Sequence, residues 1–429
     1  MILSIPTLVK VISVFGLILV LSRLRVTLSI SLIIGSFVLG LWMGLGPLRL
    51  TQSVFFSITR LQTIGLALIV WTILVISRLM KESGHLDRIV DIFCRLSRDD
   101  RTAGSVMPAL IGLLPMPGSA LFSAPMVETA LCNRHITVEK KTVVNYWFRH
   151  IWEYWWPLYP GVVLAVALLD VDTWRFMIIM APMTLVTVLS GVIFLLRSIG
   201  KKEEHNETAL SWEGIKIFLW EIMPILVVVL VIMAFSGLAS LLALAGFGLK
   251  ISGAFSILPG LVASTIWVCV VKHISFRQFR LSVMDLNVIT MMFLIAAIMV
   301  FKGVMMDSGA VLQIRDELVA YNIPVMLIIL AMPFLSGFIT GIAIGFVGTS
   351  FPLIIPMFQT PDTLKYLSCA ATAYTFGYMG MMLSPVHLCF LVTKDYFNAS
   401  LLKSYRHLIL PVLSVMVMSL LIFSILGNI

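Results

Sequence analysis

The chain has 429 residues, of which 60% are hydrophobic and only 12% are charged. A soluble protein carries about 25% charged residues, so this composition excludes an ordinary soluble globular fold. The formal net charge of +9 comes from Lys and Arg spread over short loops, a distribution typical of membrane proteins and not of a nucleic-acid-binding surface. The composition therefore predicts an integral membrane protein that lies in the lipid bilayer and has no nucleic-acid partner.

Long apolar runs recur along the whole chain, and each is long enough to cross a hydrocarbon core of about 30 Å. They predict ten transmembrane helices, over 7–22, 27–45, 61–79, 150–169, 176–196, 215–236, 252–271, 287–304, 370–393 and 405–427. Arg23 and Arg25 follow the first run, whereas a cleaved signal peptide carries its positive charge before the run. The first segment is therefore expected to stay in the membrane.

Two further apolar segments, 103–130 and 323–358, do not fit as simple crossings. The first has Pro and Gly at its centre (115–119), and the second has three glycines in its middle (341–348). Proline removes a backbone donor and glycine permits a sharp turn. Each arm is long enough to reach only about halfway through the bilayer. Both segments are therefore predicted to be re-entrant hairpins.

The distribution of Lys and Arg supports this topology. With ten crossings and two hairpins, 22 of the 30 Lys and Arg residues fall on one side of the membrane and 8 on the other. If both hairpins crossed fully, the two sides would carry equal numbers. The basic side is expected to be the cytoplasm of a prokaryotic cell, with the protein in its inner membrane. Both termini then lie outside, the first hairpin enters from the cytoplasm, and the second enters from outside.

The two halves of the sequence resemble each other. The amphipathic stretch 82–93 is similar to 307–318, and both precede a hairpin. Gly84 and Gly309 are 225 residues apart, as are Gly112 and Gly337.

This similarity predicts two inverted repeats, at 1–200 and 215–429, joined by a cytoplasmic linker at 201–214. Each repeat holds five crossings and one hairpin. Because five is an odd number, the repeats insert with opposite orientation, as in many secondary transporters.

Two segments carry a resemblance to known proteins: MPGSALFSAPMVE at 116–128 and FRHIWEYWWPLYPG at 148–161. Together with the order of elements, they resemble the ion-transporter superfamily, which includes divalent-anion/sodium symporters, gluconate permeases and arsenite-type permeases. They are most similar to an uncharacterised integral-membrane family of that superfamily, catalogued as domain of unknown function 401. The resemblance implies an elevator-type mechanism, in which hairpins and broken helices move against a fixed scaffold, and a homodimer.

The hairpin tips are candidate binding sites for a solute or coupling ion. Broken backbone at membrane depth must be buried or line a polar cavity, and helix ends there present free N–H and C=O groups. The candidates are Pro117, Gly118, Ser119 and Ser123 in the first hairpin, and Gly348, Thr349 and Ser350 in the second. The alternative is that these small residues only allow close helix packing. The Ser-Asn-Thr motifs that hold sodium and carboxylate in the symporters are absent from both tips.

Charged residues interrupt the apolar sequence after the first hairpin, at Arg149, His150 and Glu153. A charge at mid-membrane costs about 3 kcal/mol, so it usually has a partner or a task. Arg149 is a candidate anion contact and Glu153 a candidate coupling or binding residue. Alternatively, Arg149 and Glu153 only pair with each other. The aromatic residues around them are also consistent with an interfacial belt: Trp147, Trp152, Trp155, Trp156 and Tyr159.

The matching stretch of the second half, 372–388, has no carboxylate. Its candidates are the neutral donors Thr375 and Ser384 and the titratable His387, with a helix break at Pro385. A hydrogen-bonded core histidine is the alternative for His387. The five cysteines show no metal-ligand spacing, so free thiols and no metal site are expected.

The function expected from the sequence is secondary active transport of a small, anionic solute, driven by H⁺ or Na⁺ and needing no other cofactor. An ATP-driven pump is disfavoured because the sequence has no GxxxxGK[ST] loop, and a metalloprotease because it has no HExxH motif. An enzyme is therefore not expected. A channel and a lipid-carrier flippase remain alternatives, and an intramembrane enzyme is a less favoured one.

Overall fold

The computed structural model describes residues 5–84, 88, 100–116, 119–132, 136–197, 199, 212–244, 253–322 and 324–427. These residues are mostly helical and contain no strand, which confirms the predicted all-α fold class. Among them, four helical segments are long and apolar enough to cross a membrane: Leu61–Glu82, Thr173–Leu196, Phe276–Asp307 and Leu401–Gly427. Shorter apolar helices accompany them.

The helices pack as two groups, each of which draws on both halves of the chain. The first group consists of α1 (Thr7–Arg23), α2 (Leu28–Trp42), α3 (Pro47–Thr59), α4 (Leu61–Glu82), α11 (Trp212–Glu221), α12 (Met223–Leu244), α13 (Ile257–Val271), α14 (Phe276–Val283), α15 (Leu286–Asp307) and α16 (Ala310–Ala320). The second group consists of α6 (Asp100–Ile111), α7 (Ala120–Ala130), α8 (Val138–Arg149), α9 (Pro160–Leu169), α10 (Thr173–Gly191), α17 (Val325–Thr340), α18 (Ala343–Ile354), α19 (Thr363–Met382), α20 (Leu388–Tyr396) and α21 (Leu401–Gly427). Short π and 3₁₀ turns follow or precede some of them, at Val192–Leu196, Gly253–Ser256 and Ile355–Met357.

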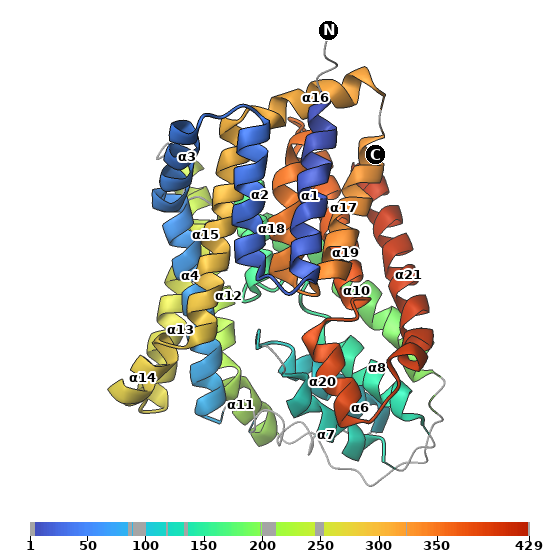
Figure 1. Cartoon of the computed structure of the whole chain (residues 1–429). Coiled ribbons are helices and arrows are strands. Elements are labelled where there is room, and N and C mark those ends of the chain that lie inside the picture. The colour runs from blue at the N-terminus through green and yellow to red at the C-terminus, as the bar shows by residue number, and fades with distance from the viewer. Residues whose placement is uncertain are drawn as a thin grey trace.

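The centre of the first group is the pair of long helices α4 and α15, which pack against each other (Figure 1). Helix α2 packs on α15, and α13 packs on α4. The short helices α3 and α14 precede α4 and α15 and were not predicted. Each has a local start signal: Pro47 stands at the first turn of α3, and Ser275 forms a capping box with Gln278 at the start of α14.

Two antiparallel helix pairs lie toward opposite ends of the second group (Figure 1). Helices α6 and α7 pack together at the lower end, and α17 and α18 pack together in the upper half. These pairs coincide with the predicted hairpins. At the exposed end of α20, Tyr396 donates a hydrogen bond to Glu128 in α7, and this carboxylate raises the pKa of Tyr396 to about 12.

The glycines that the two halves share have matching structural roles. Gly84 follows α4 with φ of 71°, and Gly309 follows α15 with φ of 70°. This left-handed conformation ends a helix at little cost only when the residue is glycine. Gly112 and Gly337 are sites of close approach: an added Cβ would lie 2.0 Å from the carbonyl oxygen of Arg149 or of Gly377, respectively. Each hairpin thus lies directly against the broken helix that follows it.

Neither broken helix is continuous, because a non-helical segment interrupts each of them. The segment predicted as one crossing at 150–169 begins with turns over 150–159, and only α9 is helical. A helix, α8, precedes the break instead. Pro157 disfavours helix just before it, and Pro160 stands at the first position of α9, so helix resumes only there. In the second half, α19 ends at Met382 and α20 begins at Leu388, so the predicted break at Pro385 is confirmed.

The start of α1 and the end of α21 both lie in the upper part of the molecule (Figure 1). There α16 runs across the ends of the long helices, and Glu317 caps α1 by accepting from the backbone N–H groups of Thr7 and Leu8, at 2.6 and 2.7 Å. The predicted amphipathic helix at 307–318 is thus present. Its counterpart at 82–93 lies mostly outside the described residues, as does most of the 201–214 linker.

Large apolar side chains are exposed along the outer helices, including Leu61 in α4, Leu185 in α10 and Ile425 in α21. A soluble monomer rarely exposes large apolar patches. This surface suits a hydrocarbon environment, in agreement with the apolar helices.

Candidate functional site

A cavity of about 700 Å³ lies between the two helix groups. One wall comes from α4 and from α15, where Val288 and Met291 line it. The opposite wall is built from the turns of both hairpins and the breaks of both broken helices. The cavity extends from Lys81 and Glu82, which are exposed at the end of α4, to buried Arg149. Its size is that of a pocket for a small molecule.

Arg149 joins the first hairpin to the first broken helix. Its Nε donates to Ser119 Oγ at 2.7 Å, and its Nη2 donates to the same hydroxyl and to the Met116 carbonyl at 3.2 Å. Its Nη1 donates to Glu153 Oε1 at 3.3 Å. The guanidinium is therefore paired with a carboxylate, and it also holds the hairpin turn in place. Pro117 and Gly118 lie outside the described residues.

Glu153 and His150 lie beside Arg149 on the same segment. Both side chains are buried and line the cavity, and His150 Nε2 lies 3.8 Å from Glu153 Oε1. A buried charge is strongly destabilising unless it is paired, so the Arg149–Glu153 ion pair accounts for both charges at this depth. The structure thus brings together the three charged or titratable candidates of the first half.

The aromatic residues of this segment tie its irregular backbone to neighbouring helices. Trp152 and Trp156 donate through Nε1 to the carbonyls of Ala109 and Leu113, at 2.8 and 3.0 Å. Tyr159 donates to another carbonyl at the end of α6. An interfacial belt does not describe these residues, because their polar atoms bond to the protein interior.

Two tyrosines of α19 satisfy carbonyls that the break leaves without helical partners. Tyr378 donates to the His150 carbonyl at 2.5 Å, and Tyr374 donates to the Glu153 carbonyl at 2.9 Å. Side chains of the second half therefore bind the backbone of the first broken helix through hydrogen bonds. The sequence alone gives no sign of these partners.

The turn of the second hairpin lies at Gly341 and Ile342, and not at 348–350 as predicted. Gly341 has φ of 67°, and α18 begins at the next position but one. Gly348, Thr349 and Ser350 lie inside α18. Their hydroxyls bond within the hairpin: Thr349 contacts Ser336, and Ser350 donates to the Phe346 carbonyl at 2.6 Å. They do not line the cavity.

His387 connects the second broken helix to the second hairpin. Its Nδ1 donates to the Gly341 carbonyl at 2.7 Å, and its Nε2 lies 3.1 Å from His150 Nε2. The ring is buried and also lines the cavity, so His387 is hydrogen-bonded as a core histidine and part of the site as well.

Three other candidates lie outside the cavity lining. Ser123 donates to the Ala120 carbonyl at 3.3 Å within α7. Ser384 accepts from the backbone N–H of Val386 at 3.4 Å. Thr375 is buried in α19. Of the neutral candidates that the structure describes, only Ser119 therefore contacts a charged residue of the site.

Two parts of the site were missed by sequence analysis. Cys389 follows His387 at the start of α20, and it lines the cavity with both histidines. On the opposite wall, Arg78 pairs with Glu82 at 2.8 Å and also with Asp285, which joins α4 to the start of α15. These residues come from segments far apart in the chain, and no local pattern links them.

The sequence matches one family model over residues 7–426, which is nearly its whole length. The family is described as "Protein of unknown function (DUF401)". The chain belongs to this family. Membership confirms the narrower of the two resemblances noted in the sequence. No curated protein matches the sequence.

Proposed function

We propose that the protein is a secondary active transporter of a small anionic solute, coupled to an H⁺ or Na⁺ gradient and acting by an elevator-like movement. The observation that carries this proposal is the position of the cavity. It lies between two separately packed helix groups, at the point where both hairpin turns and both helix breaks meet. Transporters with inverted repeats bind their solutes at such places, near the midplane and at the repeat interface.

The packing of the first group supports inverted repeats. Helix α2 packs on α15, and its equivalent α13 packs on α4, the equivalent of α15. Contacts exchanged in this way are expected when a twofold axis relates the halves. The matched conformations of Gly84 and Gly309 agree with this relation. Two equivalent halves can adopt inward-facing and outward-facing arrangements of similar energy, which is the physical basis of alternating access.

The second group is the part proposed to move, and it includes α10 and α21 as well as the hairpins and broken helices. Both α10 and α21 pack on α19 and α8, so they belong with the broken helices and not with the scaffold. The scaffold would then consist of α1–α4 and α12–α15. A homodimer through this scaffold remains part of the proposal.

The charge at the inner end of the cavity favours an anionic solute. Arg149 is buried there, and Glu153 is its carboxylate partner. A solute carboxylate or oxyanion can replace Glu153 as that partner, because a guanidinium binds planar oxyanions in the same geometry. The cavity opens beside the end of α4, on the side that the charge distribution assigns to the cytoplasm, so this arrangement corresponds to an inward-facing state.

The test is uptake into proteoliposomes that contain the purified protein. Carboxylates, sugar acids and inorganic oxyanions are offered in turn, with an H⁺ gradient, a Na⁺ gradient or neither. We expect one class of anion to accumulate under one gradient. Arg149→Lys and Glu153→Gln should abolish uptake, whereas Glu128→Gln should retain it because Glu128 is an exposed carboxylate outside the cavity. The proposal fails if no anion moves under any gradient.

A further inference from the structure

Three side chains that commonly bind metal ions meet in the cavity. His150 follows α8, while His387 and Cys389 lie at the start of α20. All three are buried, and one ligand atom from each lies within 4.8 Å of the others. Each also lines the cavity, so an ion can reach them from the open end. The proposed anion site uses Arg149 and Glu153, and it leaves these three donors without a role.

The hydrogen bonds of the two histidines fix which ring nitrogen faces the other. His150 Nδ1 lies 2.6 Å from the Tyr146 carbonyl, and His387 Nδ1 lies 2.7 Å from the Gly341 carbonyl. A carbonyl oxygen only accepts, so each Nδ1 must carry its hydrogen. In each neutral ring, Nε2 therefore presents a lone pair. This arrangement, with Nδ1–H bound to a backbone carbonyl, is the one that orients metal-binding histidines.

The two Nε2 atoms lie only 3.1 Å apart. Two neutral rings repel each other at this distance unless their nitrogens share a proton or both bind one metal ion. Zinc–nitrogen bonds of about 2.0–2.1 Å in a tetrahedral site place two nitrogens about 3.3 Å apart. The observed separation differs from this by only a few tenths of an ångström. The pair is thus nearly preformed as two ligands of one ion.

We propose that His150, His387 and Cys389 form a binding site for one borderline-soft metal ion, of which Zn²⁺ is the representative. Two imidazoles and one thiolate are a donor set that suits Zn²⁺ and disfavours Mg²⁺ and Ca²⁺, which prefer oxygen. Three protein ligands leave one tetrahedral position open, and all three donors line the cavity. Glu153 Oε1, at 3.8 Å from His150 Nε2, is the carboxylate oxygen beside it.

The site joins segments 237 residues apart, because His150 belongs to the first half and His387 to the second. A bound ion would therefore link the two broken helices across the predicted repeat interface. Binding of this ion does not depend on transport, so the site and the proposed function can fail separately.

The first test is Co²⁺ binding to the purified full-length protein in detergent. We expect one Co²⁺ per chain, with thiolate-to-cobalt charge transfer and the visible bands of tetrahedral Co²⁺, all displaced by Zn²⁺. His387→Ala and Cys389→Ser should weaken binding by at least about 100-fold, since removing only the hydrogen-bond partner of a metal ligand costs about 10–100-fold. The matched controls are Cys369→Ser, a buried cysteine outside the cluster, and His407→Ala in α21.

The second test needs no variant, so misfolding cannot obscure it. A small thiol-methylating reagent is added to the unmodified protein with and without Zn²⁺, and the modification of each cysteine is measured by peptide mass spectrometry. Zn²⁺ should slow modification of Cys389 at least tenfold and leave that of Cys369 and Cys132 unchanged. The proposal is overturned if Zn²⁺ protects no cysteine selectively, or if tetrahedral Co²⁺ bands persist undiminished in Cys389→Ser.

Discussion

At the scale of single residues, the buried ion pair of Arg149 and Glu153 can be compared with the more exposed ion pair of Arg78 and Glu82. Both pairs are four residues apart on a helix or its end, but Arg149 and Glu153 are 2% and 8% exposed, whereas Arg78 and Glu82 are 33% and 36% exposed. Breaking a buried pair leaves an uncompensated charge, whereas an exposed pair contributes little. The same spacing should therefore have very different energetic consequences.

We predict that Arg149→Gln lowers the free energy of unfolding in detergent by about 3–5 kcal/mol, because Glu153 then lacks its partner. The double variant Arg149→Gln/Glu153→Gln should recover at least half of this loss, because no buried charge is left unpaired. Glu82→Gln is the control and should cost about 1 kcal/mol or less. If the double variant is as unstable as Arg149→Gln, packing and not charge determines the effect.

The sequence predicted these residues to different degrees. Arg149, His150 and Glu153 are conspicuous because charge is rare in an apolar segment. Cys389 is not conspicuous, because one buried cysteine in a hydrophobic stretch resembles any other. Only the fold brings it to His150 from a distant segment. Similarly, the hydroxyls of Tyr374 and Tyr378 give no sign in the sequence that they bind carbonyls of the other half.

At the scale of helices, the helix pairs α6–α7 and α17–α18 could be predicted because length and breaker residues constrain them together. A segment of about 36 residues fits neither one crossing nor two. The turn of the second hairpin could not be placed, since Gly341, Gly345 and Gly348 all permit a bend. The structure uses Gly341, the one of these three with a left-handed φ, and leaves Gly345 and Gly348 inside α18.

Close packing between hairpins and broken helices leads to a second prediction. Gly112→Ala and Gly337→Ala should each destabilise the protein by about 1–3 kcal/mol or more, because the added Cβ would lie 2.0 Å from a backbone carbonyl oxygen. A backbone atom cannot move aside as a side chain can. Gly16→Ala in α1 is the control: no atom lies within 4 Å of its Cβ position, and alanine favours a helix by about 1 kcal/mol.

Thermal unfolding in detergent measures all three glycine variants. The expected order of midpoints is Gly16→Ala at or above the unchanged protein, with Gly112→Ala and Gly337→Ala clearly below it. Equal midpoints for all three would show that the hairpins do not pack against the broken helices as described.

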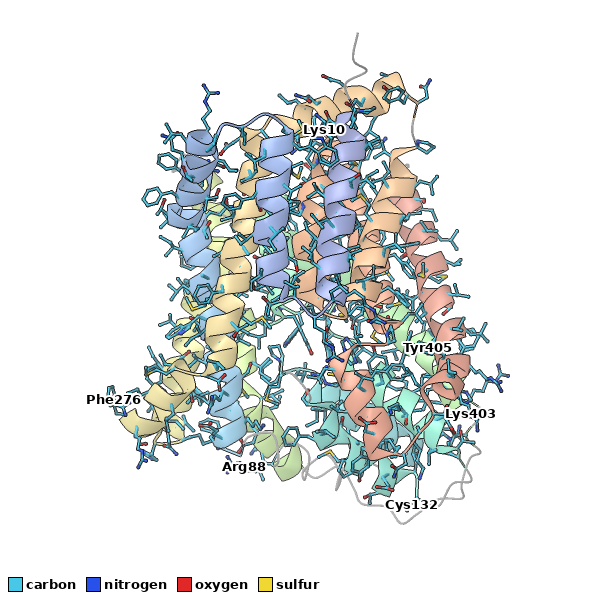
Figure 2. The ribbon with its side chains drawn as sticks, in the orientation of Figure 1. Lys10, Arg88, Cys132, Phe276, Lys403 and Tyr405 are labelled. Atoms are coloured by element: carbon cyan, nitrogen blue, oxygen red, sulfur yellow. The ribbon has the colours of Figure 1, made fainter. Side chains whose placement is uncertain are left out.

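At the scale of the whole molecule, the hairpins determine which side of the membrane every later loop faces. Figure 2 shows Cys132, Phe276 and Lys403 toward one end of the molecule and Lys10 toward the other. If the first hairpin returns to the side it left, Cys132 and position 277 beside Phe276 both face the cytoplasm. If both hairpins crossed fully, both positions would face outside. Position 359, after the second hairpin, faces outside in either case, so it serves as the reference.

We therefore predict that a membrane-impermeant thiol reagent applied to intact cells modifies Gln359→Cys but neither Cys132 nor Arg277→Cys. All three positions are exposed, so access to the reagent differs only by side. Permeabilised cells should allow modification of all three, which shows that the thiols are reactive. Peptide mass spectrometry assigns each modification and makes removal of the buried cysteines unnecessary. Modification of Cys132 and position 277 from outside would show that the hairpins are full crossings. Each half would then have six crossings, and the two halves would insert with the same orientation. The elevator-like movement, which depends on opposite orientations, would be contradicted.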